Sequence, residues 1–316
     1  MNLSQAIDTF LTSVRAEGRS PRTVEFYARS LGAFSEFVGR ERALESIVLD
    51  DLQAFVMSLR ERRTRWGSKH PRIGIQQGGL SPFSVQAFVR SIKRFFNFCV
   101  EREFIKPSQN PAIRLKRQRL PRTVPKEISD DDLTALLKAV GRSKFPERDY
   151  AILLFLAGTG CRVGGLVGLR LTDLDLERGR AIVTEKGGKS RRVFLDKVLI
   201  DALKKWLAVR QGDCDYVFVN KRGKPCTVQT IELIIKRLAR VAGVKGVCNP
   251  HAFRHRYAKR YLMNGGDLAS LSRLLGHYDV SITSQYYTIF SDEELQAKQL
   301  QHSPLRGIVG RSVRAG

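Results

Sequence analysis

The sequence lacks the features that mark membrane-bound and secreted proteins. Its longest uninterrupted apolar run is Ala151–Ala157, whereas a bilayer-spanning helix needs roughly 20 apolar residues. The first residues contain no hydrophobic signal-peptide segment. The five cysteines form no C-x-x-C pair and are odd in number, which argues against a disulfide framework or a zinc site. We therefore expect an intracellular protein with reduced, mostly buried thiols.

Acidic residues are scarce relative to basic ones. The 316 residues include 55 Lys and Arg against 31 Asp and Glu, a net charge of +24. Solubility requires far less, so the excess predicts a polyanionic partner, either nucleic acid or an acidic membrane surface. The membrane surface is the weaker alternative, because no predicted helix combines an aromatic side with a wholly basic face. The length allows two domains, each with its own core.

Apolar periodicity predicts an all-helical domain over residues 1–106. Helices are expected over Leu3–Glu17, from Ser20 onward, near Asp50–Arg63 and over Phe83–Glu101. Between the last two helices, Thr64–Leu80 is rich in glycine and basic residues without an apolar period, which predicts a loop.

Residues 107–125 have the composition of an extended linker between two domains. They contain four prolines, five Lys or Arg and no acidic residue, a pattern typical of a linker rather than of a packed element. Residues 60–122 hold 16 Lys or Arg against three Glu, and this charge is suited to phosphates; a solvated charge run is the alternative. The candidate DNA contacts in this region are Arg60, Arg62, Arg63, Lys93, Arg94, Lys116, Arg117 and Arg119.

The pattern over residues 126–316 mixes helices with two short strands. The strands are expected over Arg180–Thr184 and Arg191–Leu195, joined by a hairpin turn at Lys186–Lys189. The helices are expected from Ser129 and over Asp149–Ala157, Lys197–Arg210, Thr227–Ala242, His251–Asn264, Leu268–Leu275 and Ile282–Tyr287. The predicted fold class is therefore α+β, mainly α with a small antiparallel sheet.

Several polar residues of this second region stand out individually. Arg162 begins a largely apolar helix, where an arginine needs an anionic partner, either a protein carboxylate or a ligand phosphate. His251 and Arg254 share a helix face through their i, i+3 spacing. His277 follows Gly276, a residue type that ends helices. Taken singly, each has an ordinary structural interpretation, as does the tyrosine pair at 286 and 287.

Taken together and in order, these residues resemble the active site of the tyrosine recombinases, the family of phage integrases and chromosome-dimer resolvases. The resemblance is carried by TGCRVGGLVGLRLTDLD, EKGGKSRRVFL, HAFRHRYA and LLGHYDVSITSQYY, and it covers about residues 129–290. It implies a helical core-binding domain followed by a catalytic domain. The catalytic residues that it implies are Arg162, Lys186, His251, Arg254, His277 and Tyr286.

The resemblance also implies a mechanism. The family's nucleophile lies nine residues after the histidine of the Gly-His step, which selects Tyr286 over Tyr287. Two arginines would stabilise the transition state, and two histidines would accept a proton or bind the phosphate. Lys186 would protonate the leaving group, with Lys189 as the alternative. No metal ion, ATP or other cofactor is expected.

One position departs from the family pattern. The family commonly places a carboxylate three residues after the first arginine, where this sequence has Gly165. How Arg162 is braced is therefore open, and Asp173 and Asp175 are the candidate substitutes.

The implied partners are a double-stranded DNA recombination site, a homotetramer holding two such sites, and accessory DNA-bending proteins. The implied location is the cytoplasm, on the nucleoid of a prokaryote, and a mobile element is one possible source. The tail from about residue 291 fits either contact with a neighbouring subunit or a disordered end. Integration, excision, inversion and resolution all stay open. The alternatives are a catalytically inactive DNA-binding regulator, a type IB topoisomerase and a telomere resolvase.

Overall fold

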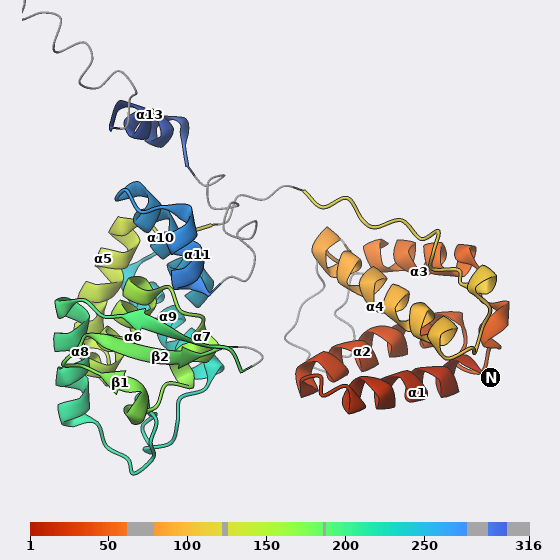
Figure 1. Ribbon diagram of the computed structural model, residues 1–316, viewed down its shortest axis with the longest axis horizontal. Coiled ribbons are helices and arrows are strands. Elements are labelled where there is room, and N and C mark those ends of the chain that lie inside the picture. The colour runs from red at the N-terminus through yellow and green to blue at the C-terminus, as the bar shows by residue number, and fades with distance from the viewer. Residues whose placement is uncertain (62–78, 122–125, 186–187, 277–289, 302–316) are drawn as a thin grey trace, which may run out of the picture. The chain divides into compact units, whose positions relative to one another are not determined.

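The chain divides into two compact units, Met1–Arg122 and Thr123–Gly316. The computed structural model describes residues 1–61, 79–121, 126–185, 188–276 and 290–301 (Figure 1). Most of the predicted loop Thr64–Leu80 and the whole predicted helix Ile282–Tyr287 lie outside these ranges. No helix in these ranges has the length and apolar character needed to cross a membrane.

The first unit is built from helices, as Figure 1 shows. Its elements are α1 (Leu3–Ala16), α2 (Pro21–Val38), α3 (Leu49–Glu61) and α4 (Pro82–Glu101), with short 3-10 turns at Leu44–Ser46 and Pro107–Gln109. Both α2 and α4 begin with proline directly after a serine cap. Proline suits the first turn, which needs no N–H donor, while the serine hydroxyl accepts a backbone N–H from that turn.

Phenylalanine fills much of the first unit's core. Phe10, Phe34, Phe55, Phe95 and Phe96 are buried completely. The rings of Phe10 and Phe95 meet edge to face with centroids 5.8 Å apart, an arrangement that adds to the apolar burial. These rings form the aromatic part of one core, which aliphatic side chains such as Leu31 and Leu59 complete.

The predicted linker differs from the structure at its beginning. Ala112 and Leu115 are buried in the core of the first unit. The Nζ of Lys93 donates to the carbonyl oxygen of Ala112 at 2.8 Å, and Asn110 donates to Asn97 at 3.2 Å. The expectation of an unpacked segment from residue 107 onward is therefore wrong as far as Leu115. Its two anchoring side chains form no helical or strand period that the sequence could reveal.

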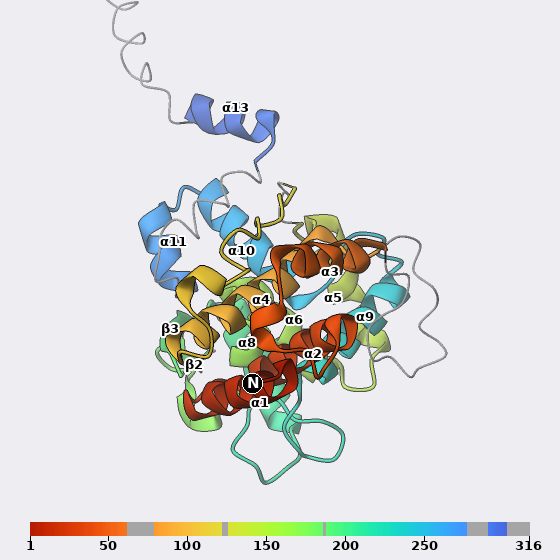
Figure 2. The same cartoon turned by 90° about the vertical axis from the view of Figure 1, so that its right-hand side faces the viewer.

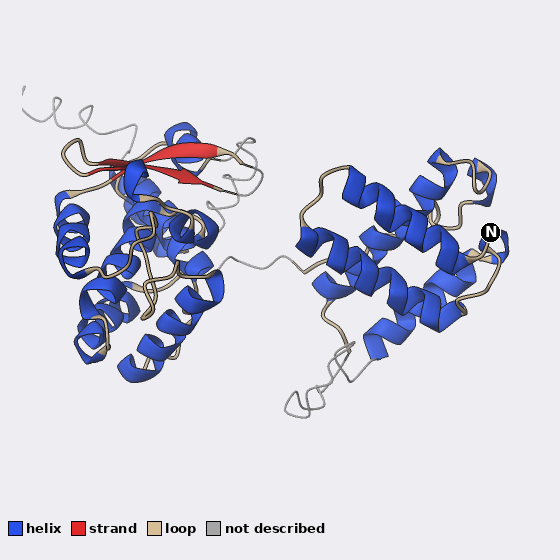
Figure 3. Ribbon diagram, turned by 90° about the horizontal axis from the view of Figure 1, so that it is seen from below, coloured by secondary structure: helices blue, strands red, loops and turns tan. Residues whose placement is uncertain are grey.

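The second unit combines helices with a small sheet. Its helices are α5 (Asp130–Ala139), α6 (Pro146–Thr159), α7 (Val163–Val167), α8 (Lys197–Val209), α9 (Val228–Ala242), α10 (Pro250–Met263), α11 (Leu268–Leu275) and α13 (Asp292–Gln301), with 3-10 turns at Val140–Arg142 and Leu171–Asp173. The antiparallel strands β1 (Leu174–Asp175), β2 (Arg180–Thr184) and β3 (Ser190–Phe194) pair in that order. Figure 3 shows them at one edge of the unit. The predicted fold class is confirmed, and β1 is an addition.

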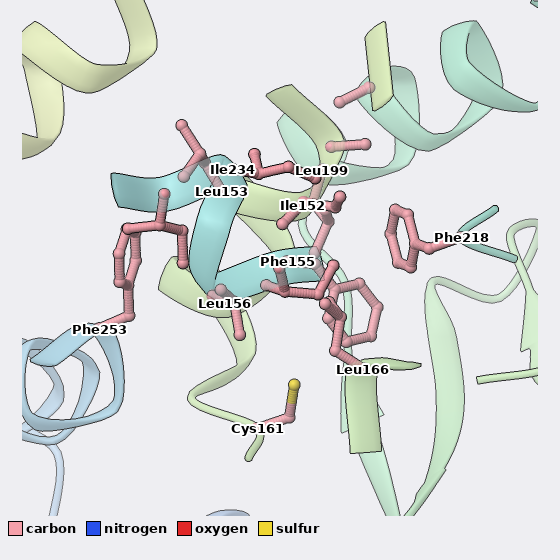
Figure 4. Close-up of a cluster of buried hydrophobic side chains, with 14 of the residues drawn as sticks. Ile152, Leu153, Phe155, Leu156, Cys161, Leu166, Leu199, Phe218, Ile234 and Phe253 are labelled. Atoms are coloured by element: carbon pink, nitrogen blue, oxygen red, sulfur yellow. The ribbon is translucent and has the colours of Figure 1, made fainter. Parts of the chain in front are cut away.

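Helix α6 lies in the core of the second unit, where it packs against α8 and α10. Its Leu153, Phe155 and Leu156 side chains are fully buried, and Phe218 and Phe253 join the same cluster (Figure 4). Burying one such side chain contributes about 1.5–3 kcal/mol. This core holds α6 and α10 together and so fixes the loop that follows α6 relative to the first turns of α10.

One arginine of the sheet, Arg191, lies on its buried face. Val183 pairs with Arg191, and Ala181 pairs with Val193. Alternate residues of a strand share a face, so Arg191 lies on the buried face with Val193. Beyond the strands, the Glu185 N–H donates to the Lys189 carbonyl at 2.9 Å and continues the hairpin. The turn residues 186 and 187 lie outside the described ranges.

The predicted tail contains a helix. Helix α13 follows Phe290, which is buried against α10 and α11 residues. The Glu294 carboxylate of α13 lies 2.8 Å from the Nζ of Lys259 in α10. A disordered end therefore does not describe residues 290–301.

All five cysteines are free, and three of them, Cys99, Cys161 and Cys226, are buried. The burial of three of the five agrees with the expectation of mostly buried thiols. Burial raises the pKa of Cys99 to about 12 and that of Cys226 to about 11. A thiol must ionise to act as a nucleophile, so these two are unreactive near neutral pH.

Candidate active site

Arg162 stands at the entrance to α7. Helix α6 ends at Gly160 in the left-handed conformation, with φ of 57°, and the chain then turns so that Arg162 is the residue before the first turn of α7. Its side chain is 41% exposed. The arginine is thus fixed through its backbone while its guanidinium reaches the surface.

A buried carboxylate, Glu185, pairs with Arg162. Its Oε1 accepts the backbone N–H of Arg162 at 3.1 Å, and its Oε2 forms an ion pair with the Nη1 of Arg162. The same Oε1 lies 3.4 Å from Arg191 Nη2 and 3.8 Å from Arg254 Nη1. The Glu185 side chain is only 6% exposed. One carboxylate therefore contacts three arginines, from the N-cap of α7, from β3 and from α10.

Arg254 is almost wholly enclosed, with 1% of its side chain exposed. It donates to the carbonyl of Gly160 at 2.7 Å and to the carbonyl of Leu275 at 2.8 Å. Arg191 donates to the neighbouring carbonyl of Leu274. The last carbonyls of a helix have no partner within the helix, and two cations satisfy them here while opposing the negative end of the helix dipole.

The end of α11 is consequently held against both α10 and β3, which lie beside it in Figure 2. Gly276 ends the helix in the left-handed conformation, with φ of 66°, as its position in the sequence predicted. A side chain at this position would meet Arg191, whose Cδ would lie 2.8 Å from its Cβ. The predicted His277 comes next and lies outside the described residues.

His251 sits in the first turn of α10. The side chain of Asn249 accepts the backbone N–H groups of His251 and Ala252, both at 3.0 Å, and so caps the helix. Partial burial lowers the pKa of His251, and the charges of Arg254 and Arg162 lower it further. The neutral form of the ring is therefore favoured, and the ring lies within electrostatic reach of both arginines.

A second histidine, His255, was not singled out from the sequence. It lies one turn beyond His251 on α10, and the two ring centroids are 5.0 Å apart. Burial lowers its pKa to about 4, with added effects from His251 and Arg254. The i, i+4 spacing of the two histidines in HAFRHRYA was the available signal.

Three of the predicted catalytic residues, Arg162, His251 and Arg254, are therefore described, and they lie together. Lys186, His277 and Tyr286, with the alternative Tyr287, fall outside the described ranges.

The two proposed substitutes for the missing carboxylate have other partners. Asp173 accepts the backbone N–H of Arg170 at 3.1 Å, and Asp175 pairs with the Nε of Arg180 at 2.9 Å. Arg162 is instead contacted by Glu185, an acidic residue that the sequence did not single out.

The candidate DNA contacts of the first unit differ in their surroundings. Arg94 pairs with Glu17 and Glu101, and Lys93 holds the chain at Ala112. Arg60 donates to Gln118. The remaining described candidates, Lys116, Arg117 and Arg119, are exposed, whereas Arg62 and Arg63 lie outside the described ranges.

Comparison with known proteins gives a consistent picture. Residues 126–294 match the model of the phage integrase family. The chain is 30% identical to tyrosine recombinase XerC of Xylella fastidiosa (strain M23), over 90% of this chain and 92% of that protein. It is also 30% identical to tyrosine recombinase XerD of Listeria innocua, over 96% and 99%. The structure of the Tn1549 transposon integrase in complex with transposon right end DNA has the same fold, with a TM-score of 0.73, 19% identity and coverage of 95% and 99%.

The fold, the arginine-rich site and these relatives define an enzyme that cleaves and rejoins DNA. The chain belongs to the phage integrase family, and it is a tyrosine recombinase that acts in site-specific recombination.

Proposed function

We propose that Tyr286 is the nucleophile of this recombinase. Its phenolic oxygen attacks the scissile phosphorus, the bond to the 5′-oxygen breaks, and a 3′-phosphotyrosyl link and a free 5′-hydroxyl result. The 5′-hydroxyl of another strand then attacks the link and releases the tyrosine. The covalent intermediate retains the energy of the phosphodiester, so the cycle requires neither ATP nor another cofactor.

The observation that carries the proposal is the meeting of Arg162, His251 and Arg254. Two of these residues are separated by about ninety positions in the chain, yet their guanidinium groups contact one carboxylate, and both lower the pKa of His251. Planar, permanently charged guanidinium groups match the oxygens of a phosphoryl transition state. A neutral imidazole beside them is able to accept a proton.

We assign the remaining roles from the resemblance to the family and from the chemistry of the residues. Tyrosine has an ordinary pKa near 10, so its proton needs an acceptor, and His251 or His277 supplies one or binds the phosphate. Lys186 protonates the departing 5′-oxygen, with Lys189 from the same hairpin as the alternative. A backbone hydrogen bond from the Glu185 N–H to the Lys189 carbonyl closes this hairpin.

The proposed partner is a double-stranded recombination site. The structures of λ integrase and of XerH that resemble this fold were determined with a COC′ core site and with a palindromic difH substrate. We propose that the two units clamp a duplex, that four protomers hold two sites, and that accessory proteins bend the DNA. The proposed location is the cytoplasm, on the nucleoid. Integration, excision, inversion and resolution are distinguished by sequencing the products.

The experiment uses nicked duplexes with randomised sequence, in which the short cleaved fragment diffuses away and traps the covalent intermediate. Adducts that survive SDS are recovered, and their DNA is sequenced to give the site. Tyr286→Phe should abolish adduct formation, and the matched control Tyr287→Phe should retain it. The reverse pattern would make Tyr287 the nucleophile, and adducts from both single variants would overturn the proposal.

A further inference from the structure

Glu185 contacts three cationic side chains, whereas a carboxylate in an ordinary surface ion pair contacts one. Its carboxylate is buried and contacts Arg162, Arg191 and Arg254, which come from three different elements. Three guanidinium groups in so small a volume repel one another, and the repulsion grows as water is excluded. The carboxylate offsets one of the three charges and leaves an excess of positive charge that suits a phosphate.

The contact between the Glu185 carboxylate and the backbone N–H of Arg162 acts at the cap of α7. Arg162 is the N-cap of α7, and Glu185 accepts its backbone N–H. In a capping box this N–H is normally accepted by a Glu or Gln at the third position of the same helix. The third residue of α7 is Gly165, which has no side chain to do so. Glu185 therefore performs from the hairpin the role that a side chain at 165 would perform locally.

The space at Gly165 supports this interpretation. A Cβ added there would lie 3.3 Å from the Cβ of Val183 and 3.5 Å from the Cγ of Glu185. Gly165 is not among the glycines with positive φ, so its backbone does not require glycine. A Cβ alone would be tight against Val183 and in ordinary contact with Glu185, so a longer side chain at position 165 would compete with the Glu185 side chain for space.

Glu185 also fixes the base of the hairpin that carries Lys186. Its N–H donates to the Lys189 carbonyl at 2.9 Å, and its own carbonyl accepts the Gly188 N–H at 3.2 Å. Backbone and side chain of one residue thus connect the hairpin to the arginines.

We propose that Glu185 is a positioning residue for strand cleavage, and that Gly165 and Glu185 are an exchanged pair in which the carboxylate has moved from α7 to the hairpin. Glu185 sets the position of Arg162 and Arg254 without contacting DNA itself. The catalytic part of this inference rests on the proposed function.

The first experiment measures single-turnover cleavage of the nicked duplex by Glu185→Gln. The amide keeps the size of the side chain and removes its charge. We expect cleavage to slow by about tenfold to a hundredfold, as for displaced catalytic groups, while the Kd for an uncleavable duplex changes less than about twofold, because the phosphate contacts that dominate affinity remain. Glu177→Gln, at an exposed position in the turn between β1 and β2, is the matched control. Cleavage at the wild-type rate by Glu185→Gln would overturn the proposal.

The second experiment exchanges the two residues. Glu185→Gly and Gly165→Glu should each slow cleavage at least about tenfold, the first for lack of a carboxylate and the second through crowding against Glu185. The double variant places one carboxylate at the third position of α7, where it can accept the Arg162 N–H. It should recover most of the lost rate and of the lost Tm. A double variant that is no faster and no more stable than Glu185→Gly would overturn the exchange.

Failure of the proposed function is distinguishable from failure of this inference. If the wild-type protein forms no covalent adduct with any duplex, the proposed nucleophile chemistry fails. The exchange is then decided by thermal unfolding alone, because recovery of Tm in the double variant requires no DNA. Adducts from the wild type together with unrecovered Tm and rate in the double variant would remove the inference and leave the function standing.

Discussion

A single glycine shows how tightly the site is built at the scale of residues. Gly160 ends α6 with a positive φ, and its carbonyl accepts a hydrogen bond from Arg254. A Cβ at this position would lie 2.5 Å from Cδ1 of Tyr257, which belongs to α10. The turn before Arg162 can therefore lie this close to the helix that carries Arg254 only because residue 160 has no Cβ.

We expect Gly160→Ala to lower the free energy of unfolding by about 2–4 kcal/mol, since the left-handed conformation and the clash with the Tyr257 ring both add cost. Urea denaturation measures the loss. Gly158→Ala is the control, because its Cβ would meet only Leu199 at an ordinary 3.7 Å, and alanine favours a helix. Equal stabilities for the two variants would contradict the prediction.

His255 should make the stability depend on pH. Its pKa is 6.5 when unfolded and about 4 in the fold, so between these values the unfolded chain binds a proton that the folded chain does not. Its contribution is therefore complete above pH 6.5 and is lost as the pH falls toward 4. In wild type, the Tm should fall across this window. His255→Gln should flatten the corresponding slope in unfolding free energy by up to about 1.4 kcal/mol per pH unit. Identical slopes in both proteins, measured by calorimetry, would count against a neutral, half-buried His255.

At the scale of elements, the sequence correctly predicted the helices and strands that local residue patterns determine. Helices such as α2 and α4 have apolar periods and serine caps, and the β2–β3 hairpin has a glycine turn between alternating strands. Strand β1, with two residues, is too short for any period. The packing of Ala112 and Leu115 depends on contacts with distant residues, which no local pattern contains.

The candidate site divides in the same way. Arg162, His251 and Arg254 could be named because ordered motifs carry them. Glu185 and Arg191 could not, because their roles arise only when the hairpin folds against α7 and α11. One signal was present: Arg191 shares a strand face with Val193, and an arginine on an apolar face implies a buried partner.

Arg191 connects β3 to the end of α11, so its loss should affect both. Arg191→Met removes the donor to the Leu274 carbonyl and one ion pair of Glu185. We expect a loss of about 2 kcal/mol in unfolding free energy, the value of a charged hydrogen bond, and slower cleavage. Arg192→Met, at the next and exposed position of β3, is the matched control and should unfold like the wild type. Equal loss in both variants would assign the effect to the strand rather than to the contact.

At the scale of the whole molecule, the two units have separate cores. The apolar cluster of the first unit ends at Leu115, and that of the second begins at Ile128. A fragment of residues 1–118 should therefore unfold cooperatively. A fragment that stops at residue 106, the boundary expected from composition, loses Ala112 and Leu115 and should be less stable by about 2–4 kcal/mol. Equal denaturation midpoints for the two fragments would instead support a domain boundary at residue 106.

The net charge of +24 predicts DNA binding that weakens steeply with salt, because each neutralised phosphate releases counterions. If the exposed Lys116, Arg117 and Arg119 lie on phosphates, replacing all three with glutamine should reduce the slope of log K against log salt concentration by up to about 2.7. The control replaces three exposed lysines of α8, Lys197, Lys204 and Lys205, and changes the net charge equally. Titrations at several salt concentrations distinguish direct phosphate contacts from a general effect of charge. Loss of direct contacts reduces the slope only in the first triple variant, whereas a general effect of net charge alters the binding of both triple variants equally. An equal reduction in both would mean that the segment after Leu115 contributes only to the general field of the protein.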